Sequence, residues 1–176
     1  MPDIVRNGDL TLKQRVDLIK RCLMIGGVNL LGEKQLDNSF YCFDVLMNDR
    51  KIKLCLLLKN IVNSGWSDKP MIKRIQVKSF KMNEVEKNTS ETCSMFIGIA
   101  YANEIPVFVS WNPFMFLYHN TVRSCYIDVE LLARCQHEGL IKTTSSRQKV
   151  ILSDPNHFCE MVTLFLEQNT IGQLWN

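Results

Sequence analysis

The fold is decided by residues 40–58, which read FYCFDVLM (40–47), NDR (48–50) and KIKLCLLL (51–58). The first and third segments are apolar-rich runs of strand length, and the middle one is a polar turn. The third segment opens with alternating lysine and apolar residues and then becomes wholly apolar. One end of this strand should therefore be half exposed and the other should lie in a core. The stretch predicts a β-hairpin.

A second hairpin is predicted further along the chain. Residues 95–101 and 106–111 carry no charge and flank Ala102-Asn103-Glu104-Ile105, which has the composition of a turn. Because neither segment is charged, we expect both strands to be central. Residues 150–152 predict a short strand, and the hydroxyl-rich segment 141–148 before it is predicted to be a loop.

Between the two hairpins, residues 71–78 alternate in polarity. Successive side chains of a strand point to opposite faces, so Arg74, Gln76 and Lys78 should share one face. The polar segment before this strand, with Gly65 and Trp66, predicts a loop.

Helices are predicted at both ends of the chain. Thr11-Leu12-Lys13-Gln14 has the form of a capping box, and apolar residues at helical spacing continue from it to Gly26-Gly27. Residues 1–10 before this helix are predicted to be a loose leader. At the other end, Pro155 suits a first helical turn, and apolar residues recur at i, i+3, i+4 and i+7 from Phe158.

These elements predict an α+β fold, a mixed and largely antiparallel sheet with flanking helices at both termini. With 176 residues, the chain is long enough for one well-buried core and short for two. We therefore expect a single domain, 1–176. Its leader and first helix would occupy 1–35, and the sheet core with the C-terminal helix would occupy 40–169.

Composition argues against several classes of protein. Apolar residues make up 46% of the chain and charged residues 22%, as in ordinary globular proteins. No apolar run approaches the roughly 20 residues of a membrane-spanning helix. The N-terminus mixes Asp3, Arg6 and Asp9 where a signal peptide would be apolar, so we expect a cytoplasmic protein without a membrane partner. The seven cysteines form an odd, scattered set, which argues against a disulfide framework.

Positive charge gathers in one part of the chain. Residues 51–90 hold nine Lys or Arg and three acids, a balance of +6, so the rest of the chain carries −3 within a total of +3. A local basic field of this kind can hold phosphate, although a solvated face is the commoner explanation of such a run.

Motifs of common enzymes are missing from the sequence. There is no CxxC or HxxxH pair for a metal, no GxSxG elbow for a nucleophile and no glycine-rich phosphate loop. We expect no cofactor and no self-sufficient catalytic site.

One enzymatic alternative stays open. Asp44 followed by Asp49-Arg50-Lys51 resembles an acid and an acid-x-Lys group, which can bind Mg²⁺ and orient water in a divergent metal-dependent restriction endonuclease. Asp49, however, stands where a hairpin turn favours Asp for its own backbone contacts. The catalytic set under this alternative is Asp44, Asp49 and Lys51.

Side chains suited to nucleic acid are more frequent. Lys and Arg bind phosphates, Arg, Asn, Gln and Ser read base edges, and an exposed aromatic ring stacks on a base. Trp66 is the stacking candidate, whereas Trp111 ends an apolar strand and should lie in the core. Pairing of Arg74 or Arg123 with an acid such as Asp44 or Asp128 is the structural alternative. The DNA-binding candidates are Trp66, Arg74, Gln76, Lys78, His119, Asn120, Arg123, Ser124, Arg147 and Lys149.

Four ordered segments carry a resemblance to a known family. They are Lys59-Asn60, Arg74-Ile75-Gln76-Val77, Val107 to Pro113 and Asn120 to Ser124. Over about residues 40–169, the chain resembles the methylase-associated X1 type of domain found in bacterial restriction systems.

The resemblance implies a DNA-recognition or accessory role beside a DNA methyltransferase or a restriction nuclease. Double-stranded DNA would then be the partner, and the matched positions would be Arg74, Gln76, Asn120, Arg123 and Ser124. It carries over no catalytic residue. A protein-interaction subunit that docks through the aromatic residues 114–118 is a further alternative.

Overall fold

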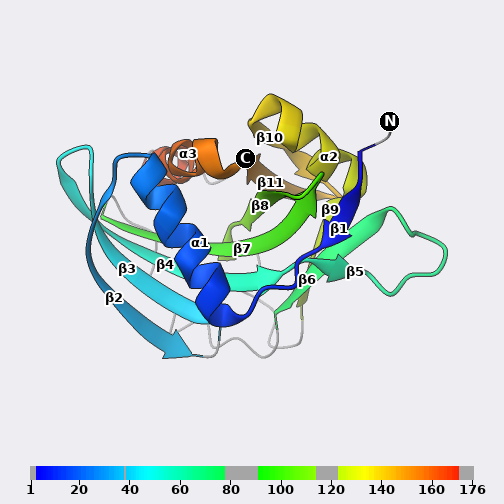
Figure 1. Cartoon of the computed structure of the whole chain (residues 1–176), viewed down its shortest axis with the longest axis horizontal. Coiled ribbons are helices and arrows are strands. Elements are labelled where there is room, and N and C mark those ends of the chain that lie inside the picture. Colours follow the sequence, from blue (N-terminus) through cyan, green and yellow to red (C-terminus); the bar gives the residue numbers. More distant parts are fainter. Residues whose placement is uncertain (1–2, 38, 78–90, 114–122, 171–176) are drawn as a thin grey trace.

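The computed structural model describes residues 3–37, 39–77, 91–113 and 123–170 (Figure 1). Strands in this part of the chain form a larger sheet of eight and a smaller sheet of three. The larger sheet has the order β10 (Leu140–Ser145), β11 (Gln148–Ser153), β8 (Ile105–Trp111), β7 (Thr92–Ala102), β4 (Arg50–Asn60), β3 (Phe40–Met47), β2 (Asn29–Asp37), with β1 (Val5–Asn7) also paired to β7. The smaller sheet has the order β5 (Val62–Asn63), β6 (Ile72–Val77), β9 (Arg123–Asp128).

Neighbouring strands are antiparallel except for β4 and β7, which run parallel. Helix α1 (Leu12–Ile25) follows β1, α2 (Val129–Glu138) follows β9, and the turn η3 (Pro155–His157) leads into α3 (Phe158–Thr170). The predicted α+β fold, with a mixed and largely antiparallel sheet and helices towards both termini, is confirmed. No helix among the described residues has the length and apolar character needed to cross a membrane.

The larger sheet is covered on both faces. Leu54, Leu56 and Leu58 of β4 belong to the core formed with α1 and α3, which lie on the same side of the sheet in Figure 1. The alternate residues Cys55 and Leu57 belong to the core formed with α2 and the smaller sheet. Burial on both faces explains why this strand becomes wholly apolar after the alternating residues 51–54 at its start.

Among the described residues, the turns of three hairpins consist of two residues each. Asn48-Asp49, Asn103-Glu104 and Ser146-Arg147 all have positive φ, between 48° and 64°. Such paired left-handed residues match the twist of the strands that they connect, and Asn and Asp tolerate them well. The two predicted hairpins are confirmed. The third turn shows that the prediction of a loop at 141–148 was wrong, because most of this segment is paired strand.

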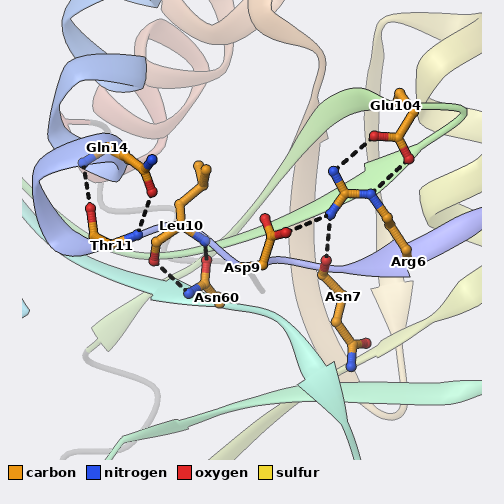
Figure 2. A network of polar contacts seen from close by, with 8 residues as sticks. All are labelled: Arg6, Asn7, Asp9, Leu10, Thr11, Gln14, Asn60 and Glu104. Carbon is orange, nitrogen blue, oxygen red and sulfur yellow. Dashed lines mark hydrogen bonds and ion pairs between the residues drawn. The ribbon is translucent and has the colours of Figure 1, made fainter.

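The prediction of a loose leader was also wrong. Val5–Asn7 pairs with residues 100–102 of β7, and polar contacts anchor the chain within this strand and after it (Figure 2). Arg6 donates from Nε and Nη2 to the two carboxylate oxygens of Glu104, at 2.7 and 2.8 Å. The side-chain amide of Asn60 donates to the carbonyl of Leu10 at 2.8 Å and accepts from its N–H at 3.2 Å.

The start and end of α1 follow the sequence pattern. Thr11 Oγ1 accepts from the N–H of Gln14, and the Gln14 side chain accepts from the N–H of Thr11, which completes the predicted capping box. Gly27 has a φ of 72° after the helix, a conformation that glycine adopts without strain. The chain then enters β2, an edge strand that begins within residues 1–35, the segment predicted to hold the leader and the first helix.

Candidate nucleic-acid interface

The smaller sheet has one buried and one outward face. Ile75 and Cys125 point inward and are fully buried in the core shared with α2. Their neighbours along the strands, Arg74 and Gln76 on β6 and Ser124 and Tyr126 on β9, are half-buried and form what we call the outward face.

Strand pairing brings the residues of the outward face together. Arg74 lies directly opposite Tyr126, and Gln76 lies directly opposite Ser124. Directly opposed residues of an antiparallel pair project on the same side, with Cβ atoms about 4.5–5.5 Å apart. Ser124 is thus a neighbour of Arg74 and Gln76, although it lies 50 positions after Arg74 in the chain, and all three were singled out from the sequence.

The guanidinium of Arg74 donates a hydrogen bond to a neutral hydroxyl group. Its Nη1 donates to Ser124 Oγ at 3.3 Å, while its Nε is buried and has no acceptor among the described residues. The ion pairs of the described residues include none to Arg74. Asp128, the acid that could have paired with it, accepts instead from Ser145 Oγ at 2.7 Å. Arg74 therefore keeps a positive charge that no described carboxylate neutralises.

Trp66 lies against the outward face from the loop between β5 and β6. Its ring stacks on Tyr126, with centroids 4.6 Å apart and an interplanar angle of 25°. The ammonium of Lys69 lies 4.9 Å from the centroid of the same ring. Trp66 is still 39% exposed, whereas Trp111 is fully buried as expected. Tyr126 was not singled out from the sequence, although its alternation with Ser124 could have indicated a shared face.

The hairpin of β10 and β11 closes one side of the outward face. Gln148 Oε1 accepts from the N–H of Tyr126 at 2.7 Å, and Gln148 Nε2 donates to the carbonyl of Ser124 at 3.2 Å. These contacts place the tip of the hairpin, with the exposed Arg147, beside β9. Lys149 follows in β11 and is half-buried. The role of Gln148 depends on tertiary pairing, and no local sequence signal indicates it.

Lys73 does not contribute to this surface, although it belongs to the basic segment. It points inward and is 8% exposed, and its ammonium donates to Asn7 Oδ1 at 2.5 Å and Asn63 Oδ1 at 2.8 Å. Burial lowers the pKa of this ammonium below its ordinary value. Lys73 ties β1 and β5 to β6 and is not available to a phosphate.

Several predicted residues lie outside the described part of the chain. They are Lys78, His119, Asn120 and the aromatic segment 114–118. The backbone of Arg123 pairs with Val77, but its side chain is also outside the description.

The residues of the nuclease alternative lie elsewhere. Asp44 is exposed on β3 opposite Lys53, and Asp49 occupies the β3–β4 turn with a φ of 60°, as the turn interpretation predicts. Lys51 is exposed near the start of β4. The described residues contain no group of three or more His, Cys, Asp or Glu side chains that could hold a metal ion.

Histidine and cysteine side chains do not form a nucleophile pair in the described residues. His157 Nδ1 lies 2.7 Å from Asp154 Oδ1, but the same carboxylate caps the N–H of His157 at 2.9 Å, which gives it a structural role. Burial raises the pKa of the Cys22 and Cys135 thiols to about 12. A thiol with a raised pKa stays protonated at neutral pH and is a poor nucleophile.

The model of the methylase-associated X1 family matches residues 52–162, which is well over half of the chain. This chain belongs to the methylase-associated X1 family. The matched region runs from β4 into α3 and contains the whole smaller sheet, so the outward face is part of the X1 domain. Neither the curated proteins nor the solved structures contain a match.

Membership supports an association of this X1 domain with a methylase and with restriction-modification. The elements before residue 52, which include α1 and β2, lie outside the family match. Of the elements before residue 52, α1 and β3 contribute buried residues to the core that contains Leu54, Leu56 and Leu58.

Proposed function

We propose that this X1 domain is a DNA-recognition module of a bacterial restriction-modification or defence system. It acts in the cytoplasm beside a DNA methyltransferase or a nuclease subunit, and it supplies DNA contacts without catalysis of its own. The observation that carries the proposal is the outward face: Arg74, Gln76 and Ser124 stand together, and no described carboxylate neutralises Arg74.

The chemistry of these side chains suits base edges. A guanidinium can donate two hydrogen bonds to the O6 and N7 of guanine, and a glutamine amide can pair with the N6 and N7 of adenine. Arg74 and Gln76 stand on successive outward positions of one strand, about 7 Å apart. This spacing lets them reach neighbouring bases, and the hydroxyl of Ser124 limits the orientation of Arg74.

Phosphate contacts come from the rim of the same face. Lys69 is exposed in the loop of Trp66, and Arg147 is exposed at the tip of the β10–β11 hairpin. The loop of Lys69 leads into β6, which pairs with one edge of β9, and the hairpin of Arg147 contacts the other edge. Both residues could therefore contact a DNA backbone lying across the face. Lys78, His119, Asn120 and Lys149 are proposed from the sequence to extend this surface. Arg123, whose backbone pairs with Val77 and not with a residue of the outward face, is proposed to contact DNA beside it. Such contacts provide affinity and orientation but no sequence information.

The experiment that tests the function measures DNA binding by Arg74→Ala. The preferred sequence would first be selected from a random duplex pool, and affinities would be measured by fluorescence anisotropy over a series of salt concentrations. Loss of a bidentate base contact costs about 1–3 kcal/mol, so we expect a loss of about fivefold to a hundredfold on the selected site and a much smaller loss on unrelated DNA.

Arg134→Ala is the matched control. Arg134 is an exposed arginine on α2 that pairs with Glu138, and its loss should leave binding unchanged. Equal binding by Arg74→Ala and the wild-type protein on every sequence, with the fold intact, would reject the proposed role of the outward face.

A further inference from the structure

The outward face combines charge with exposed aromatic surface. Trp66 is 39% exposed, although tryptophan is normally well buried. Its ring is supported from one side by Tyr126, which itself lies opposite Arg74. The aromatic pair therefore forms a platform within a polar and cationic surface.

An intact duplex makes little use of such a platform. In double-stranded DNA the flat faces of the bases are stacked on one another, and only their edges are accessible in the grooves. An aromatic ring gains a stacking partner only where a base is single-stranded or has left the stack. Aromatic side chains on the open face of an antiparallel sheet serve this purpose in proteins that bind unpaired nucleic acid.

We propose that the outward face binds an unstacked nucleobase, in single-stranded or locally opened DNA, on the ring of Trp66. Arg74 and Gln76 contact the edge of this base. The inference rests on the proposed DNA-recognition function and adds the structural class of DNA that the domain prefers.

In the absence of DNA, Lys69 lies over the Trp66 ring. Its ammonium is 4.9 Å from the ring centroid, and Tyr126 stacks on the same ring. A single cation over an exposed ring is a weaker contact than a stacked base, and the lysine side chain is long and exposed. The incoming base displaces Lys69, which turns towards the phosphate of the same nucleotide. The cation thus protects the ring from solvent before binding and holds the backbone afterwards.

The test compares three fluorescent DNA probes of one sequence: a perfect duplex, the same duplex with one looped-out nucleotide, and the single strand. We expect the wild-type protein to bind the looped-out and single-stranded probes at least about fivefold more tightly than the duplex, as stacking on one aromatic ring predicts. Trp66→Ala should bind all three probes with the affinity of the duplex. Trp66→Phe keeps an aromatic ring and should retain part of the preference.

Two controls separate this effect from a general loss of structure. Leu30→Ala removes an apolar side chain of similar exposure, 41%, from the β2 edge of the larger sheet, and should leave all three affinities unchanged. Quenching of tryptophan fluorescence by the looped-out probe reports stacking directly. We expect it in the wild-type protein and not in Trp66→Phe, which keeps the other two tryptophans, Trp111 and Trp175.

The outcomes distinguish the two proposals. If none of the probes binds, the DNA-recognition function itself is wrong. If the duplex binds through Arg74 but the looped-out and single-stranded probes bind no better, the function stands and the unstacked base is rejected. A preference that persists in Trp66→Ala would reject the platform as its origin.

Discussion

The side chain of Gln148 pairs with the backbone of Tyr126 as a neighbouring strand would. Its Oε1 accepts from the N–H of Tyr126 at 2.7 Å, while its Nε2 donates to the carbonyl of Ser124 at 3.2 Å. Because β9 is the edge of the smaller sheet, these two backbone groups have no strand partner on that side. One glutamine therefore joins the β10–β11 hairpin of the larger sheet to the edge of the smaller one.

Gln148→Ala should destabilise the protein by about 1–3 kcal/mol, because it leaves a half-buried backbone donor and an acceptor without their partners. Urea unfolding followed by circular dichroism measures this change. Gln148→Glu is the graded control, since its carboxylate can accept from the N–H of Tyr126 but cannot donate to the carbonyl of Ser124. We expect it to fall between the other two proteins. Equal stability of Gln148→Ala and wild type would show that the two hydrogen bonds of Gln148 do not stabilise the folded protein.

Arg147→Gly separates charge from turn geometry. Arg147 has a φ of 63°, which glycine adopts more readily than arginine, so this change should preserve or stabilise the hairpin while it removes the charge. We expect DNA affinity to fall by a similar factor on all sequences. The slope of log affinity against log salt should fall by about 0.9, the loss of one phosphate contact. An unchanged salt slope would exclude Arg147 from the interface, and Arg147→Lys should restore it.

Stability should decrease in alkaline solution because of the buried cysteines. Burial raises the pKa of Cys135 from 9.0 to about 12 in the folded protein, so the thiol ionises more easily in the unfolded chain. Because the pKa is higher in the folded protein, the contribution of the buried thiol to the free energy of unfolding is present in full below pH 9. It decreases as the pH rises towards 12.

The difference between wild type and Cys135→Ala isolates this contribution. Between pH 8 and pH 10 in urea, the free energy of unfolding of the wild type should fall more than that of Cys135→Ala. The extra loss is at most about 1.4 kcal/mol for each pH unit above the ordinary thiol pKa. Parallel pH profiles of the two proteins would show that Cys135 does not titrate differently on unfolding.

Asp49→Asn tests the nuclease alternative without disturbing the hairpin. Asparagine tolerates the left-handed φ of 60° at this position, whereas the carboxylate needed for a metal ion is lost. With Mg²⁺ or Mn²⁺, we expect neither the wild-type chain nor the variant to cut plasmid DNA. Cuts by the wild type that disappear in Asp49→Asn would instead establish the metal-dependent endonuclease.

Local patterns were sufficient for much of the fold. The capping box at Thr11, the hairpin turn at Asn48-Asp49 and the turn at Asn103-Glu104 depend on residues close in sequence, and the structure has all three. The alternation of residues 71–78 correctly predicted a shared face for Arg74 and Gln76. Each of these features follows from side-chain periodicity or backbone preference within a few residues.

Pairing between distant segments could not be predicted in the same way. Val5–Asn7 contains the polar residues Arg6 and Asn7. It forms a strand because it pairs with residues 100–102 of β7, which lie beyond the residues of β7 that pair with β4. The hydroxyl-rich segment that becomes β10 is likewise a strand through its pairing with β11. Composition favoured a loop in both places, and tertiary hydrogen bonds overrode it.

The sequence by itself determined the class of the fold, the hairpin turns and the start of α1, and it supplied the candidate side chains for the proposed DNA interface. Only the tertiary structure decided which of them meet: it placed Ser124 beside Arg74, stacked Trp66 on Tyr126 and turned Lys73 inward to Asn7. The physical reason is that periodicity specifies the face of a strand on which a side chain lies. Which residue lies next to that side chain depends on the strand register between segments far apart in the chain.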